Sequence, residues 1–149
     1  MSARLSPDGR ADYAVHLDIP TRWNDNDTYG HVNNAVYYEY FDTCVNRWLI
    51  GAGLLELGRS AVIGLVVDTG CSYFAPLSFP EVVTAGLRVV RVGTSSVRYE
   101  IGLFGEGAEM CAARGHFTHV YVDEATRRPV ALADRFRAAV EGLRVDAPS

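Results

Sequence analysis

The stretch RWNDNDTYGHVNNAVY, residues 22–37, joins a segment with strand periodicity to a segment with helical periodicity. Its first half is rich in Asn, Asp and Gly, which readily adopt the backbone conformations of turns. Asp25 and Asp27 are therefore predicted to lie in a turn that leads into a helix. The first turn of a helix leaves backbone N–H groups unpaired and partly positive. The stretch thus places a carboxylate that can act as a base beside donors that can polarise an acyl carbonyl.

The flanking segments indicate where this turn begins and ends. Residues 13–23 alternate between apolar and polar side chains, as a strand with one buried face does. From residue 34 the apolar side chains recur at helical spacing, which predicts an amphipathic helix over residues 34–50. Asn33 or Asn34 is expected to cap the start of this helix, and Gly51 and Gly53 to end it.

Four more strands are predicted along the rest of the chain, over residues 62–74, 81–92, 95–104 and 109–122. The links between them are short, which indicates antiparallel neighbours. A last helical pattern begins near Asp134. The prediction is therefore an α+β fold in one domain that spans residues 1–149.

Some of the predicted strands are apolar at successive positions, for example at residues 62–67 and 89–92. Continuous apolar strands are typical of sheets that are covered on both faces. Because one long helix covers only one face, a second copy of the chain is expected to cover the other. We therefore expect a homo-oligomer, either a dimer or a homotetramer.

Composition argues against several classes of function. The formal net charge is -4 and the basic residues form no stripe, so nucleic acid is not an expected partner. No run of apolar residues is long enough to cross a membrane, and the first residues lack the apolar core of a signal peptide. These features predict a cytoplasmic protein without a membrane partner.

The turn has other interpretations. Asp25 and Asp27 are also suited to bond the N–H groups of the turn itself. The spaced acids resemble the start of a calcium-binding EF-hand loop, but the twelfth position of that loop is Val36 instead of Glu, which argues against calcium. His31 has the side chain of a general base or a metal ligand, although a His in such a turn is more often a structural hydrogen-bonding residue.

Other reactive side chains favour structural roles. His116 and His119 are three apart on a predicted strand, so alternation sends them to opposite faces and they form no metal pair. Cys44 lies on the apolar stripe of the predicted helix, which favours core packing over nucleophilic catalysis. With Cys71 and Cys111 it makes an odd, widely spaced set, and all three are expected to be small buried hydrophobes.

The central stretch resembles the hotdog-fold acyl-CoA thioesterases, in particular the branch related to 4-hydroxybenzoyl-CoA thioesterase. The match is to Asp25-x-Asp27-x-x-Gly30-His31-Val32-Asn33-Asn34-x-x-Tyr37, and weaker landmarks are Tyr73-x-x-Pro76, Gly93-x-Ser95-Ser96 and Val120-x-Val122-Asp123. The resemblance covers most of residues 12–143. It implies an antiparallel sheet of five or six strands wrapped around the long helix.

The resemblance also implies an activity, hydrolysis of an acyl-CoA to free acid and CoA, which needs no metal or redox cofactor. It implies that Asp27 is the catalytic carboxylate, as general base or as nucleophile, that Asp25 has a structural role, and that the Asn34 backbone N–H binds the oxyanion. Gly30 would then let the chain turn closely into the helix, and His31 and Asn33 would hold the loop.

The remaining implied residues contact the substrate. Tyr37 is expected to line the acyl site, and CoA is expected to bind at a subunit interface through its phosphates. Arg91, Ser95 and Ser96 are the candidates for that phosphate contact. Two other functions fit the same pocket, a hydratase or dehydratase of acyl thioesters and a non-catalytic acyl-CoA-binding module.

Overall fold

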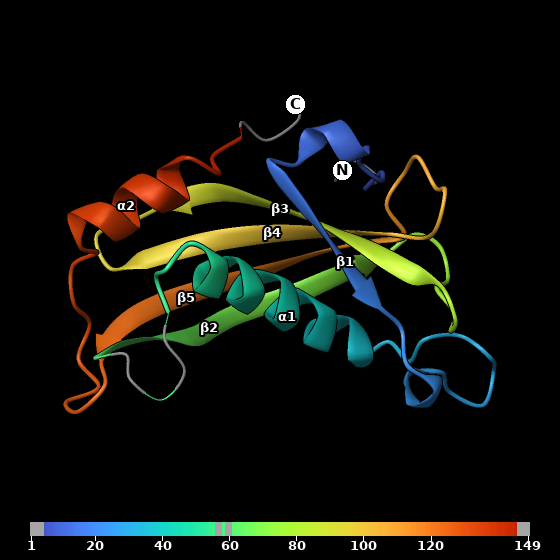
Figure 1. Ribbon diagram of the computed structural model, residues 1–149, viewed down its shortest axis with the longest axis horizontal. Helices are drawn as coiled ribbons and strands as arrows, with labels where there is room; N and C mark the ends of the chain where they lie inside the picture. The colour runs from blue at the N-terminus through green and yellow to red at the C-terminus, as the bar shows by residue number, and fades with distance from the viewer. Residues whose placement is uncertain (1–4, 56–57, 59–60, 146–149) are drawn as a thin grey trace.

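The computed structural model describes residues 5–55, 58 and 61–145. Within them, five strands form one antiparallel sheet in the order β1-β3-β4-β5-β2 (Figure 1). The strands are β1 (Val15–Pro20), β2 (Val62–Tyr73), β3 (Val82–Val92), β4 (Ser96–Phe104) and β5 (Ala113–Asp123). The helices are α1 (Val36–Gly51) and α2 (Asp134–Glu141), and short 3-10 turns cover Arg10–Asp12 and Trp23–Asp25.

The long helix α1 lies along one face of the sheet, as Figure 1 shows. Its buried face consists of Tyr37, Tyr40, Phe41, Cys44, Val45 and Leu49. The helix packs directly onto the backbone of β5 at Gly115, where a Cβ atom would overlap the ring of Phe41. This arrangement confirms the expected hotdog architecture, with five strands.

The start of α1 differs from the prediction. The helix begins at Val36, its N-cap residue is Ala35, and no side chain caps it. The Asn33 side chain instead accepts a hydrogen bond from the Ala35 N–H (2.9 Å), two residues ahead. Asn commonly makes such a local turn, and here the turn delays the helix by two residues. The end of α1 at Gly51 agrees with the prediction.

The position of β2 also differs from the prediction. β2 precedes β3 in the chain, yet it pairs with β5, from Val62 opposite Asp123 to Tyr73 opposite Ala113. The prediction from short links is therefore correct for the pairs β3–β4 and β4–β5. It is wrong for β2 and β3, which are not neighbours in the sheet. As a result β2 is an edge strand, and its apolar residues Val62, Leu65, Val66 and Val67 are exposed in the single chain.

The outer face of the sheet over β3 and β4 is covered by the chain's own N-terminal segment. The ring of Tyr13 lies against Gly86 and Gly102, where no side chain intervenes. Below it, the Arg88 guanidinium is only 2% exposed and binds the carboxylates of Asp8 (3.2 Å) and Glu100 (2.6 Å). This segment takes the place that the sequence suggested for a second copy on that part of the face.

Candidate active site

Residues 25–33 form a tight hairpin between β1 and α1. The Asp27 N–H donates to the His31 carbonyl (2.8 Å), and the Asn33 N–H donates to the Asp25 carbonyl (2.9 Å). The chain reverses at Gly30, whose φ of 82° lies in the left-handed region that favours glycine. The hairpin fixes Asp27 opposite His31. His31 in turn lies three residues before Asn34.

In the first carboxylate of the hairpin, that of Asp25, both oxygens accept hydrogen bonds within the chain. Its side chain is 1% exposed and accepts hydrogen bonds from the Tyr40 hydroxyl (2.7 Å) and from the backbone (2.8 Å) and side chain (3.0 Å) of Arg22. Burial alone raises the pKa of Asp25, but the bonds from Tyr40 and Arg22 hold it below its ordinary value. Asp25 therefore anchors the hairpin to α1.

The second carboxylate, Asp27, is half-buried. Its Oδ1 accepts a hydrogen bond from the Tyr29 N–H (2.8 Å). No hydrogen bond to Oδ2 exists among the described residues. One oxygen thus stabilises the turn, as the structural interpretation predicts, and the other is available to a ligand.

The peptide groups of residues 33–35 lie at the entrance to α1. The Asn34 backbone N–H has no hydrogen-bond acceptor within the described part of the chain. Its neighbours are held: the Asn34 carbonyl accepts from the Tyr73 hydroxyl of β2 (2.7 Å), and the Asn33 carbonyl accepts from the Val36 N–H (2.9 Å). A fixed, unpaired amide of this kind is suited to bind an oxyanion.

A second layer of contacts holds the hairpin from the segment that follows β2. The Ser78 hydroxyl donates to the Gly30 carbonyl (3.0 Å), and the Asn26 side chain accepts from the Phe79 N–H (3.0 Å). The Val32 N–H donates to the Leu77 carbonyl (2.7 Å). Sequence reasoning did not identify Asn26 or Ser78 as loop-holding residues, because their partners are about 50 residues away along the chain.

The residues predicted to hold or line the site have different environments. The Tyr37 side chain is buried and packs edge-on against Tyr73, with ring centroids 4.9 Å apart. Burial raises the pKa of Tyr37, so its hydroxyl stays protonated. His31 is exposed, and within the described residues its side chain makes no hydrogen bond.

Within one chain, the three residues predicted to contact CoA lie far from Asp27. Arg91 is exposed near the end of β3, Ser95 lies in the turn to β4, and Ser96 begins β4, at the opposite end of the sheet from the hairpin (Figure 1). The residue of β3 that pairs with Pro20 near the hairpin is Val82. Arg91 is nine positions further along this strand, about 30 Å at the usual rise per residue.

The other reactive side chains are placed as follows. His116 lies on the outer face of β5 and bonds Asp68 (3.0 Å), whereas His119 is buried on the inner face, which confirms that the two imidazoles point apart. Cys44 and Cys111 are buried as predicted, but Cys71 is only half-buried, because it lies on the edge strand β2. Burial raises the pKa of the Cys44 thiol to about 12.

Two further findings concern metal ions and membranes. Over the described residues, no group of three His, Cys, Asp or Glu side chains is arranged to hold a metal ion. In the same part of the chain, no helix has the length and apolar character needed to span a bilayer.

Comparison with known proteins places this geometry in a family. Residues 21–140 match the family model of the thioesterase-like superfamily. No match was found among curated proteins. The chain is similar to the PA5185 protein from Pseudomonas aeruginosa strain PAO1, with 48% identity, a TM-score of 0.93, and coverage of 96% of this chain and 100% of that one.

Two other solved structures are similar over most of their length. The PA2801 protein from Pseudomonas aeruginosa is 32% identical, with a TM-score of 0.80 and coverage of 86% of this chain and 98% of that one. A thioesterase from Thermus thermophilus, solved with coenzyme A and zinc, is 29% identical, with a TM-score of 0.72 and coverage of 87% of this chain and 94% of that one.

Proposed function

Because this chain is a thioester hydrolase that belongs to the thioesterase-like superfamily, we propose that it hydrolyses acyl-CoA substrates with Asp27 and the Asn34 backbone N–H as its catalytic groups. The Thermus relative with bound coenzyme A supports CoA as the thiol part of the substrate. The acyl group can be identified by comparing the rates at which thiol is released from different acyl-CoAs.

One observation carries the assignment of Asp27. The hairpin contains two carboxylates, and Asp25 is buried with its oxygens bonded to Tyr40 and Arg22. Asp27 is the carboxylate that retains an oxygen without a described partner, and its N–H is bonded to His31 on the opposite hairpin arm, the arm that leads to the unpaired Asn34 amide. A base and an oxyanion donor are the two requirements of acyl transfer.

The reaction follows from these two groups. Asp27 removes a proton from water as the water oxygen bonds to the thioester carbonyl carbon, and the Asn34 N–H stabilises the resulting oxyanion. When the carbonyl reforms, the C–S bond breaks. Asp27 gives the proton it had taken to the departing sulfur, so the products are the free acid and the free thiol, and Asp27 is again ionised. In the alternative route the Asp27 oxygen itself bonds to the carbon, the thiolate leaves, and water then cleaves the mixed anhydride.

We also propose that a second copy of the chain completes the site through β2. This edge strand exposes unpaired backbone groups and the apolar side chains of Val66 (46% exposed) and Val67 (60% exposed), a combination that favours pairing with another strand. A two-fold axis through the middle of β2 places Tyr73 of one chain beside the start of the partner strand. Ser96 lies at the same end of the sheet as the start of β2, because Val120 of β5 pairs with Ser96 on one side and with Leu65 of β2 on the other.

This assembly reconciles the two halves of the predicted site. In one chain the CoA-contact residues and Asp27 are at opposite ends of the sheet, but antiparallel pairing of two β2 strands turns one end toward the other. The phosphates of a CoA whose thioester lies at Asp27 would then reach the partner subunit's Ser96.

The test is release of free thiol from a panel of acyl-CoAs, measured with Ellman's reagent. The wild-type chain should release thiol with repeated turnover, whereas a binding module or a hydratase would not. Asp27→Asn should lower kcat by at least about 100-fold while substrate still binds. Asp134→Asn, at the start of α2, is the matched control and should behave as wild type. Near-normal turnover by Asp27→Asn would remove this residue from the mechanism.

A further inference from the structure

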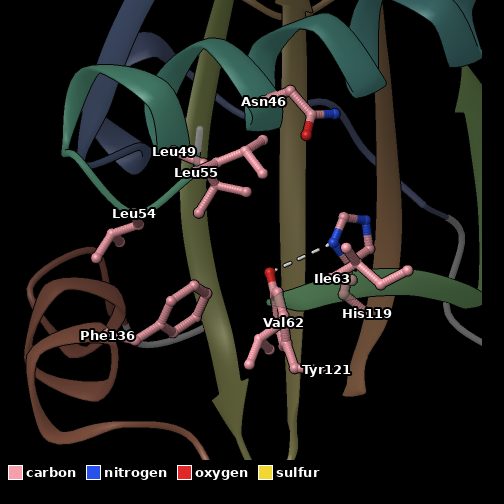
Figure 2. A pocket seen from close by; sticks show the side chains of 10 residues that line it. Asn46, Leu49, Leu54, Leu55, Val62, Ile63, His119, Tyr121 and Phe136 are labelled. Atoms are coloured by element: carbon pink, nitrogen blue, oxygen red, sulfur yellow. Dashed lines mark hydrogen bonds between the residues drawn. The ribbon is translucent and has the colours of Figure 1, made fainter. Parts of the chain in front are cut away.

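A cavity of about 160 Å³ lies at the carboxyl-terminal end of α1, between that helix, β2, β5 and α2 (Figure 2). Most of its wall is apolar and is formed by Leu49, Leu54, Leu55, Val62, Ile63 and Phe136. Asn46, which lines it from α1, is twelve residues after Asn34, or about 18 Å along the helix axis. The cavity is therefore separate from the Asp27 hairpin in the same chain.

The imidazole of His119 lines this cavity, and one of its two ring nitrogens lacks a partner among the described residues. The residue is 4% exposed, and its Nε2 atom is buried without a hydrogen bond to any described residue. Its Nδ1 is 3.4 Å from the Tyr121 hydroxyl, which is bonded in turn to the Tyr99 hydroxyl (2.7 Å). Burial lowers the pKa of His119, so the ring is neutral. Native proteins rarely leave a buried polar atom unpaired, because no protein contact then replaces its lost hydration.

A second polar group lines the cavity from the helix. The Asn46 side chain donates from Nδ2 to the backbone (2.8 Å) and the carboxylate (3.0 Å) of Asp42, which leaves its Oδ1 without a partner among the described residues. Figure 2 shows Asn46 on α1 and His119 on β5 at one side of the cavity, with Leu54 and Phe136 at the other. The cavity thus has one polar side and one apolar side.

From this distribution we propose that the cavity binds a small apolar molecule with one hydroxyl group, of the size of phenol, with the hydroxyl at His119. A cavity of about 150 Å³ with aliphatic walls accommodates a benzene ring. A hydroxyl both donates and accepts, so it pairs with the neutral imidazole in either tautomer and with the Asn46 oxygen. The described residues that line the cavity include no Lys or Arg, so an anion would lose its hydration without a counter-charge.

The experiment is an NMR titration of the full chain with phenol and with toluene, following the imidazole nitrogens of His119. Phenol should bind saturably, shift the His119 nitrogens, and bind about tenfold more tightly than toluene, the ratio expected for one net hydrogen bond. In His119→Leu, phenol affinity should fall to that of toluene. His116→Leu, on the outer face of the same strand, should bind phenol as wild type does.

Two further variants keep the proposal open to refutation. Asp27→Asn should bind phenol normally, so the cavity is tested independently of the proposed hydrolysis. Leu49→Phe enlarges a buried side chain that lines the cavity from α1 and should abolish binding even if His119→Leu does not fold. Absence of saturable binding, equal affinities for phenol and toluene in the wild type, or retained binding in Leu49→Phe would overturn the proposal and leave an ordered water as the occupant.

Discussion

Replacing Tyr40 by Phe tests whether the hairpin is anchored through Asp25. The hydroxyl of Tyr40 donates to Asp25 Oδ2 at 2.7 Å, and both side chains are almost completely buried. Hydrogen bonds to charged groups contribute about 1.5–3 kcal/mol. Because the Asp25 carboxylate keeps its bonds from Arg22, Tyr40→Phe should lower the free energy of unfolding by about 1.5–3 kcal/mol at pH 7.

The pH dependence of this effect has a definite sign. The Tyr40 bond is one of the contacts that hold the pKa of Asp25 low in the folded chain. A lowered carboxylate pKa stabilises the fold above the unfolded pKa, near 4, and this stability is lost as pH falls through the folded pKa. The difference between wild type and Tyr40→Phe should therefore be largest at neutral pH and shrink below about pH 4.

Urea denaturation at a series of pH values measures both effects. Tyr38→Phe is the control, because its hydroxyl makes no hydrogen bond within the described residues; it should change stability by less than about 0.5 kcal/mol. A loss in Tyr40→Phe no larger than this control, or a loss that persists unchanged at acid pH, would refute the anchoring role.

Three other changes test the fold and the site. Gly115→Ala should lower the free energy of unfolding by about 1–3 kcal/mol, seen as a lower thermal midpoint, because the new Cβ overlaps the Phe41 ring; an unchanged midpoint would contradict this packing. Tyr73→Phe should lower kcat about tenfold with little change in KM, since the Asn34 peptide loses its support; an effect on KM alone would indicate substrate binding instead. Val67→Lys on the edge strand should give monomers in light scattering and lose thiol release, and full activity as a monomer would exclude the proposed assembly.

Sequence patterns predicted the elements well where they depend on local chemistry. Alternation and helical spacing are properties of neighbouring residues, so all five strands and both helices were predicted close to their observed bounds. The pairing of β2 with β5 was not predicted, because it depends on where α1 and the segment after β2 direct the chain. The start of α1 was misplaced because the hydrogen bond that the Asn33 side chain accepts from the Ala35 N–H competes with helix capping.

The site was predicted in part for similar reasons. The hairpin motif identified the residues near Asp27, but it gave no means to tell that Asp25 is buried, since this depends on Tyr40 and Arg22 folding over it. The residues proposed to contact CoA were assigned by resemblance, and their distance from Asp27 in one chain appears only in three dimensions. The cavity at His119 gave no sequence signal, because its wall combines residues from two helices and two strands.

The N-terminal segment over β3 and β4 also restricts how these molecules can assemble. Arg88 depends on Asp8 for one of its carboxylate partners, and stripping a partner from a buried charge costs about 3–5 kcal/mol. The outer faces of two sheets therefore cannot pack against each other over β3 and β4 unless residues 8–13 first dissociate from this surface. Removal of the residues before Ala14 would leave Arg88 with Glu100 as its carboxylate partner and would expose the neighbouring glycines Gly86 and Gly102. Any higher assembly that forms with the segment in place must use other surfaces.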